Sequence, residues 1–114
     1  MKITPEIVDS VICKHVGLLP EMLYWESQRQ RIVEGRKISI VMRMAILKQN
    51  DTKACGSFGK HRTMGYSSIT TFLNLYETDK IFQHLVNQIL SELEINKVDF
   101  LIKVKKVFKK KDIL

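Results

Sequence analysis

The sequence predicts an all-α protein, a multi-helix bundle that contains a helix-turn-helix and carries an extra basic helix at its C-terminus. Three observations predict this class. Apolar residues recur at intervals of three and four along nearly every long stretch, which is the spacing of one helix face. Alternating apolar and polar runs are short, and two-residue hairpin signals are missing. At 114 residues, 45% of them hydrophobic, the chain is long enough for one domain with its own core.

The first helix is expected to begin at Pro5. Thr4 offers a side-chain oxygen as a cap, and a proline loses little at the first helical position, where an N–H would have no partner. The apolar face continues as far as Gly17, a residue typical of helix C-termini. The sequence therefore predicts that this helix ends at Gly17.

A connector over 18–23 leads to the longest expected helix, 28–47. Tyr24 and Trp25, between the two, are expected to be core anchors. Gly35 marks either a later start of this helix or a bend in it. The basic residues of the helix are expected to project outward: Arg29, Arg36, Lys37 and Arg43.

Two shorter helices follow, and their lengths suit a helix-turn-helix. Residues 50–52 break the long helix and can cap a brief helix over 53–58. A loop over 60–65 joins it to a further helix that is expected to start near Tyr66 and Ser67. In this motif the second helix presents its N-terminal residues to the major groove of DNA.

Thr78 and Asp79 offer a cap for another helix, in which apolar residues recur every four positions: Ile81, Leu85, Ile89 and Leu93. The composition changes after this helix. Two units are therefore predicted, a helix-turn-helix domain over 1–94 and a basic amphipathic helix or tail over 95–114.

The net charge of +7 is concentrated in two blocks. Nine Lys or Arg stand against three acids over 26–63, and seven Lys stand against two Asp over 95–114, with an acidic stretch between the blocks. This distribution suits a surface that faces a polyanion and a back that faces solvent. Charge alone does not distinguish a nucleic-acid binder from other basic proteins.

No apolar run approaches the roughly 20 residues of a membrane span, and no signal-peptide pattern is recognisable. We therefore expect a cytoplasmic protein without membrane contact. Cys13 and Cys55 are expected to be reduced core thiols, because two cysteines form no disulfide framework.

Enzymatic function is not expected. The run over 56–61 superficially suggests a phosphate-binding loop, but that loop has four residues between its glycines and a Ser or Thr after its lysine. Here two residues separate Gly56 from Gly59, and His61 follows Lys60, so no ATP site is predicted. The cysteines and histidines lack the paired spacing of a zinc site, so neither a metal nor a cofactor is expected.

Small hydroxyl residues gather near the expected start of the second helix of the motif: Ser67, Ser68, Thr70 and Thr71. Such side chains can reach base edges or phosphates, and the helix dipole favours the phosphate. The alternative is that Ser67 only caps the helix.

Several segments resemble the C-terminal DNA-binding domain of the bacterial replication initiator DnaA. The first helix, the connector over 16–23 and the region 36–38 follow that family's order and spacing. The family's helix-turn-helix signature is Phe-Gly-Gly-Arg-Asp-His-Thr-Thr-Val, and two parts of this chain resemble its start and its end: Phe58-Gly59 and Tyr66-Ser67-Ser68-Ile69. The similarity covers roughly residues 4–80 and includes no part of the initiator's ATPase.

The resemblance implies that the hydroxyl pair reads the major groove and that an arginine before the long helix enters the minor groove. Arg31 is the nearest candidate for that arginine, though Arg29 could serve, and Arg36 or Lys37 would lie near the DNA backbone. Two cations of the loop are candidates for the family's loop arginine. Together the candidate DNA-binding residues are Arg29, Arg31, Arg36, Lys37, Lys60, Arg62, Tyr66, Ser67, Ser68 and Thr71.

The departures from the family fall where specificity is determined. The chain has about three extra residues inside the signature, and Gly65 stands where the family has Asp. Tyr66 in place of His changes the hydrogen-bond donors, and Ser in place of Thr removes methyl groups that pack on a thymine methyl. Recognition of the initiator's standard binding site is therefore not implied.

Two functions remain open. The first is sequence-specific binding of double-stranded DNA by a nucleoid-associated protein, linked to replication initiation or its regulation. The second is an interaction protein that keeps the scaffold without base recognition and binds a protein partner through 95–114 or through the acidic region 77–94. The Lys-rich tail fits phosphate contact, and it also fits a solvated helix that covers the core or a partner-binding helix.

Overall fold

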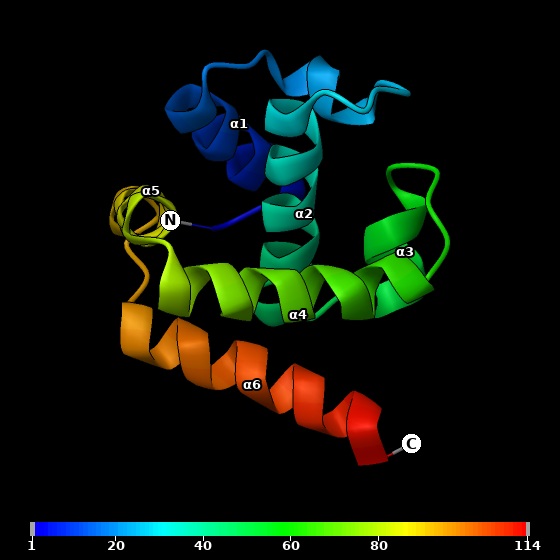
Figure 1. The fold of residues 1–114 in the computed structure, drawn as a ribbon, viewed down its shortest axis with the longest axis vertical. Helices are drawn as coiled ribbons and strands as arrows, with labels where there is room; N and C mark the ends of the chain where they lie inside the picture. Colours follow the sequence, from blue (N-terminus) through cyan, green and yellow to red (C-terminus); the bar gives the residue numbers. More distant parts are fainter. Residues whose placement is uncertain (1, 114) are drawn as a thin grey trace.

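The computed structural model describes residues 2–113, with side chains as far as Lys109, and its described residues form six α-helices and one 3-10 turn without any strand (Figure 1). The predicted all-α multi-helix bundle is therefore confirmed. In chain order the elements are α1 (Pro5–Val16), η1 (Pro20–Tyr24), α2 (Gln30–Ala45), α3 (Asp51–Gly56), α4 (Thr63–Thr78), α5 (Lys80–Glu92) and α6 (Lys97–Ile113).

Three helices start at the predicted capping residues. The hydroxyl of Thr4 and the side-chain oxygen of Asn50 each accept a hydrogen bond from the backbone N–H three residues on, at 3.3 and 2.7 Å. The Asp79 carboxylate caps α5 by accepting two backbone N–H groups. Gly17 ends α1 with a φ of 75°, a left-handed conformation that glycine adopts without strain.

Helix α2 is the centre of the molecule, and 11 of its 16 residues are buried because other elements surround it. Figure 1 shows it upright, with α4 crossing its lower end, α1 on one flank and α3 on the other. The helix is shorter than the expected 28–47. Gly35 lies inside it and not at its start, and a Cβ there would come within 3.0 Å of Leu23 Cδ2, so glycine lets η1 pack closely.

Helices α3 and α4 pack against each other in helix-turn-helix order, but α4 starts earlier than expected. Its first residue is Thr63 and not Tyr66. The His61 ring accepts a hydrogen bond from the Thr63 N–H at 3.3 Å, and the His61 carbonyl accepts the next N–H at 2.9 Å. The connection moves from the predicted 60–65 to 57–62, so Ser67 lies a full turn inside α4.

The predicted apolar face of α5 is partly wrong. Ile81 is 84% exposed, although the every-four-residue series placed it on the buried side. A strict spacing of four drifts by about 40° per step around a helix of 3.6 residues per turn, so such a series leaves the core face. The helix instead buries residues spaced by three and four: Phe82, Val86, Ile89 and Leu90.

Tyr24 and Trp25 are not core anchors, since each is 48% exposed. The Tyr24 ring packs on Phe58 at a centroid distance of 4.8 Å. The 3-10 turn η1, which ends at Tyr24, lies at the surface and buries only Leu23.

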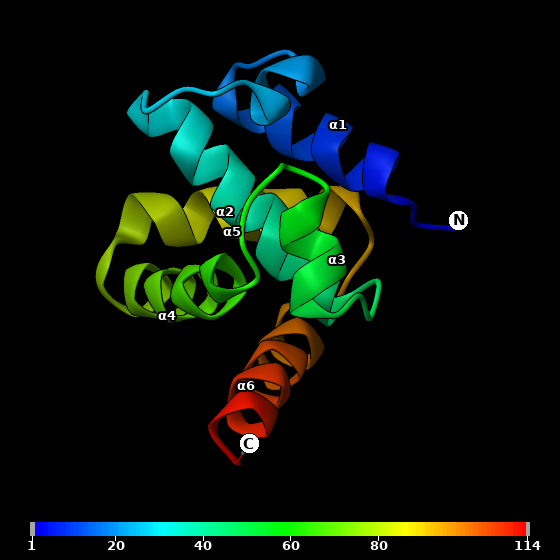
Figure 2. The ribbon, with the colours of Figure 1, turned by 90° about the vertical axis from the view of Figure 1, so that its right-hand side faces the viewer.

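Helix α6 joins the same core as the other helices. Phe100 and Val104 are fully buried, and the Phe100 ring meets Phe72 of α4 edge-on at 5.8 Å. In Figure 2 the C-terminal end of α6 extends beyond the other helices. The side chains of Lys110 and Lys111, which belong to the predicted lysine tail, lie outside the described residues.

Candidate nucleic-acid interface

The outer face of α4 is a stripe of short polar side chains. Its exposed residues follow the helical spacing of three and four: Thr63, Ser67, Thr70, Asn74 and Glu77. No charge occurs on this stripe before Glu77, near the C-terminal end of the helix. We call these five residues the α4 stripe.

Two hydroxyls of the α4 stripe donate hydrogen bonds within their own helix. Ser67 Oγ donates to the Met64 carbonyl at 3.2 Å, and Thr70 Oγ1 donates to the Tyr66 carbonyl at 3.1 Å. A hydroxyl that donates in this way keeps lone pairs that can accept. The stripe therefore presents hydrogen-bond acceptors to solvent, and the Asn74 amide adds both a donor and an acceptor.

Ser68 does not belong to this face, contrary to prediction. Ser68 is 0% exposed, and its Oγ has no hydrogen-bond partner among the described residues. It lies four residues before the buried Phe72 and eight before Tyr76, so it projects into the core. Direct contact between Ser68 and DNA is therefore excluded in this conformation.

Tyr66 is only partly accessible. Its ring stacks on Phe108 of α6 with a centroid distance of 5.0 Å and an interplanar angle of 22°. Tyr66 therefore joins α4 to α6, and one face of its ring is covered.

Arg36 is a structural residue and does not project outward. It is 5% exposed, and its guanidinium donates to the carbonyls of Leu23 at 3.0 Å and Trp25 at 2.6 Å. These carbonyls lie at the end of η1 and have no helical donor. These hydrogen bonds from Arg36 fix the position of the backbone at the start of the segment 25–29, which leads into α2.

Arg43 is also buried, where an outward side chain was predicted. Its Nη2 lies 2.7 Å from Asp9 Oδ2 and 2.9 Å from Tyr24 Oη, and the side chains of Asp9, Ser39, Arg43 and Tyr24 form one hydrogen-bonded group. We call it the Asp9 network. Burial, and then the hydrogen bond to Asp9, raise the pKa of Tyr24, so its hydroxyl stays protonated at neutral pH. The Arg43 guanidinium also lies 4.6 Å from the Phe58 ring centre.

The remaining basic candidates of α2 differ in surroundings. Arg29 is exposed at the start of the helix, where its N–H donates to Ser27 Oγ. Arg31 is exposed, and its Nη1 lies 3.6 Å from the point where a Cβ on Gly17 would be, at the end of α1. Lys37 is partly buried and faces α4.

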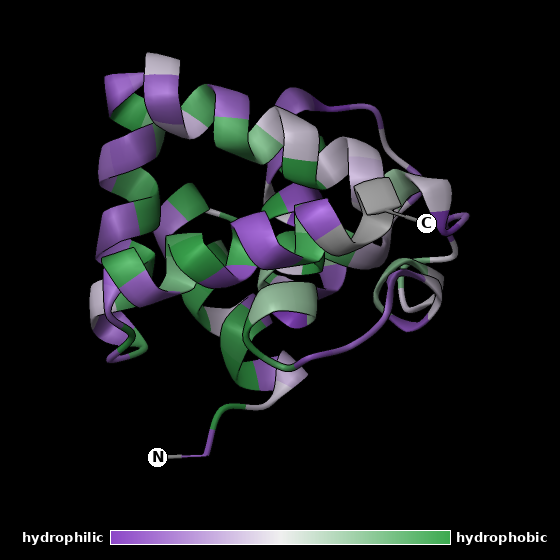
Figure 3. Cartoon of the chain, turned by 90° about the horizontal axis from the view of Figure 1, so that it is seen from below, coloured by the Kyte–Doolittle hydropathy of each residue, from purple (hydrophilic) through white to green (hydrophobic). Residues whose placement is uncertain are grey.

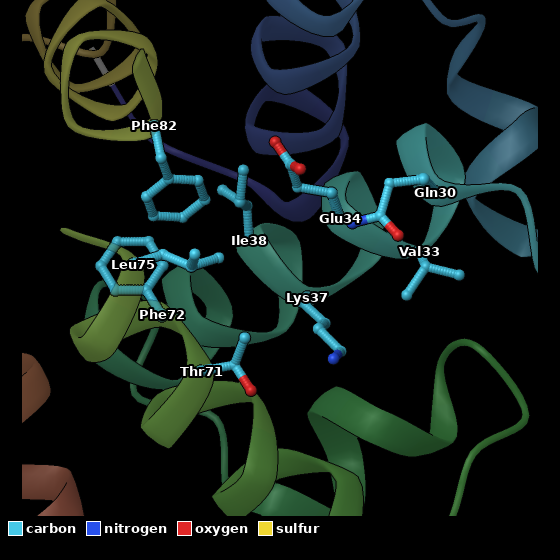
Figure 4. Close-up of a pocket in the computed structure, with 9 residues that line it drawn as sticks. All are labelled: Gln30, Val33, Glu34, Lys37, Ile38, Thr71, Phe72, Leu75 and Phe82. Atoms are coloured by element: carbon cyan, nitrogen blue, oxygen red, sulfur yellow. The ribbon is translucent and has the colours of Figure 1, made fainter. Parts of the chain in front are cut away.

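A cavity of about 100 Å³ lies between α2 and α4 beside Lys37. Figure 4 shows Lys37 and Thr71 on its two sides, with Phe72 and Phe82 at its apolar end. Burial, and then the negative charge of Asp79, raise the pKa of Glu34 at the α2 side of this cavity. Thr71 is therefore partly enclosed, unlike the residues of the α4 stripe.

The loop between α3 and α4 contains the other basic candidates. Arg62 is exposed. Lys60 is partly buried and forms an ion pair of 3.7 Å with Glu26, so the loop is attached to the segment that Arg36 holds. Because Glu26 is exposed, this ion pair is weak, and Lys60 can exchange Glu26 for another anion.

Figures 1 and 2 together show that α4 and the N-terminal half of α2 lie on the same side of the molecule. This side carries the α4 stripe, Lys37, Thr71 and the start of α2 with Arg29. Of the ten predicted residues, Lys37 and Thr71 line the same cavity, Ser67 lies on the exposed face one turn before Thr71, and Arg36 and Ser68 lie in the interior.

The described residues hold no group of three His, Cys, Asp or Glu side chains placed to bind a metal, and no described helix is long and apolar enough to cross a membrane. Cys13 and Cys55 are buried free thiols. Burial, with smaller contributions from Asp9 and Glu21, raises the pKa of Cys13 to about 11, so this thiol is protonated and a poor nucleophile at neutral pH.

No family model, curated protein or solved structure matches this chain. The resemblance to the initiator domain therefore stays a prediction, and the proposals below depend on the residues and geometry described here.

Proposed function

We propose that this protein binds double-stranded DNA sequence-specifically and inserts the outer face of α4 into the major groove. The observation that carries the proposal is the α4 stripe, whose residues before Glu77 are small, polar and uncharged, on an exposed helix that follows a short helix and a turn. A solvated surface helix usually carries Lys, Glu or Arg on its outer face. Uncharged side chains with free lone pairs can accept hydrogen bonds from base edges. Exposure to solvent alone would not require a face without charges.

The basic residues beside the stripe support the same orientation. Arg29 and Lys37 lie on the same side of the molecule as α4, and Arg62 immediately precedes its first turn. Phosphate contacts from such residues would set the position of the protein on the duplex, while the stripe supplies the sequence preference. Arg31 is exposed beside Gly17, at the C-terminal end of α1.

The resemblance to the initiator domain points to a role in replication initiation or its regulation. No ATP site was predicted from the sequence, so the proposal concerns duplex binding and does not include strand opening. Duplexes with initiator binding sites should therefore be included among the DNA tested, although the altered signature predicts a different preferred sequence.

The direct test is selection from a random duplex library at two salt concentrations. We expect a defined motif that persists at the higher salt, because base contacts depend less on ionic strength than phosphate contacts do. Salt-sensitive binding without a motif would contradict sequence-specific recognition.

Two serine variants then locate the contact. Ser67→Ala should weaken binding to the selected motif about tenfold, since a good base contact contributes about 1–3 kcal/mol. Ser68→Ala is the matched control, because this neighbouring hydroxyl is buried and should leave DNA affinity unchanged. Equal affinities for both variants and the unsubstituted protein would contradict the role of the stripe.

An interaction protein is the second candidate, and one surface favours it. A groove of about 630 Å³ lies between α4, α5 and α6, with Leu73, Tyr76 and Leu101 among its lining residues. Val98 and Ile102 on α6 are exposed. If this function holds, Val98→Asp with Ile102→Asp should abolish partner binding, while the protein's salt-dependent attraction for DNA should persist.

A further inference from the structure

We propose that one flank of α6, carrying Lys105 and Lys109, is a second DNA contact that holds phosphates at the rim of the groove occupied by α4. This inference rests on the proposed function and adds to it a partner surface outside the helix-turn-helix. It concerns a sequence-independent contact, whereas the α4 stripe supplies the sequence preference.

Helix α6 is fixed beside α4 by contacts along its length. Phe100 and Val104 are fully buried, and Phe108 stacks on Tyr66 in the first turns of α4. Figure 1 shows the two helices running in opposite directions, with the C-terminal part of α6 near the N-terminal part of α4. The lysines of α6 therefore have a fixed position relative to the α4 stripe.

The two sides of α6 face different surroundings. Lys105 lines the groove together with Leu73 and Asn74 of α4, so it lies on the flank that adjoins the stripe. Lys109 is four residues further and lies on the same flank. Lys103 is two residues before Lys105, which places it about 200° around the helix axis. All three side chains are exposed.

Neighbouring packed helices have axes about 8–10 Å apart. The major groove of B-DNA is about 12 Å wide, so one helix fills it. If α4 occupies the groove, the neighbouring α6 lies over the phosphates at the edge of the groove. Lys is suited to this place, since its compact charge contacts phosphate without requiring a particular base.

These lysines are also available for binding. No described carboxylate lies within ion-pair distance of Lys103, Lys105 or Lys109. Figure 3 shows α6 from below, with hydrophilic and hydrophobic segments interleaved along it toward the C-terminus. A helix that buries Phe100 and Val104 and leaves Lys103, Lys105 and Lys109 without a carboxylate partner suits a phosphate-facing position better than a purely structural one.

The test measures how affinity for the selected duplex depends on salt. Each engaged lysine contributes about one unit to the slope of log affinity against log salt. Lys105→Gln should lower the slope by about one unit and Lys105→Gln with Lys109→Gln by about two, with equal loss on all duplex sequences. Lys103→Gln is the matched control on the same helix, and its slope should equal that of the unsubstituted protein.

Helix content by circular dichroism should be the same in all variants, since Gln and Lys have similar helix propensities. Equal changes for Lys103→Gln and Lys105→Gln, or no change for Lys105→Gln, would overturn the inference and leave the α4 proposal intact. Failure of the unsubstituted protein to bind any duplex would overturn both.

Discussion

At the scale of single residues, the Asp9 network is the main concentration of buried polarity among the described residues. Asp9 accepts hydrogen bonds from Tyr24, Ser39 and Arg43, so both of its carboxylate oxygens have donors. A buried charge is tolerated when it is paired and hydrogen-bonded in this way. The network joins α1, η1 and α2 at defined positions.

Removing one member of this network should be costly. Asp9→Ala leaves the Arg43 charge buried without its partner, so we expect the free energy of unfolding to fall by about 3–5 kcal/mol in urea denaturation. The double variant Asp9→Leu with Arg43→Met removes both charges and should lose less than Asp9→Ala alone. A larger loss in the double variant would contradict this account.

A second residue-scale prediction concerns Glu92. Its carboxylate accepts hydrogen bonds from Lys14 and from His15, at 3.2 and 3.1 Å, and these two contacts lower its pKa. Because the pKa is lower in the folded state, the stabilisation is complete above the usual Glu pKa, near 4.5, and is lost as the pH falls below it. Glu92→Gln should flatten the fall in thermal stability at acid pH.

Glu94→Gln is the control for this measurement, since Glu94 is an exposed carboxylate two residues away and is outside the ion pair. It should preserve the acid dependence of the melting temperature. Identical pH profiles for Glu92→Gln and the unsubstituted protein would contradict the role of Glu92.

Some residue roles could be predicted from the sequence and others could not. The burial of Ser68 follows from its spacing to Phe72 and Tyr76 once α4 is a helix. The burial of Arg36 and Arg43 does not follow from spacing, because their partners are carbonyls and a carboxylate from distant segments. An arginine is most often exposed, so the sequence favours the outward position.

At the scale of secondary-structure elements, the junction of α3 and α4 depends on one close approach. A Cβ on Gly65 would lie 3.1 Å from Asp51 Cβ and 3.3 Å from Cys55 Sγ, both on α3. Gly65 therefore sets how closely the two helices of the motif pack. The start of α4 was missed because Arg62 has no capping side chain, whereas Thr4, Asn50 and Asp79 mark the other starts.

Two alanine variants test this junction. Gly65→Ala should lower the free energy of unfolding by about 1–3 kcal/mol, because overpacking forces the helices apart. Gly56→Ala is the control on α3, since a Cβ there meets nothing within 4 Å and alanine favours the helix by up to about 1 kcal/mol. A stabilising Gly65→Ala would show that the junction has room.

At the scale of the whole molecule, α6 and the other helices share one core. Phe100 and Val104 are among its fully buried residues. Deletion of 96–114 should therefore abolish cooperative thermal unfolding, measured by circular dichroism, because it exposes the apolar surface that these residues cover. The lysine substitutions proposed above should leave the melting transition cooperative. A truncated chain with an unchanged transition would contradict this role of α6.

The sequence predicts the fold class and most helix positions, because capping residues and apolar spacing are local properties. It predicts the candidate interface less completely. The stripe residues Ser67 and Thr70 were identified from the sequence, but Asn74 was not. The packing of α6 on α4 includes the Tyr66–Phe108 contact, which joins segments far apart in the chain.

The hydrogen bond from Arg36 to the Trp25 carbonyl has a spectroscopic consequence. Trp25 is the single tryptophan of the chain, and its side chain is half exposed on a segment whose backbone is anchored. Its fluorescence therefore reports on the region between η1 and Arg29 without any added label. Docking of a polyanion at the start of α2 should shift or quench this emission, and a ligand confined to the α4, α5 and α6 groove should leave it unchanged.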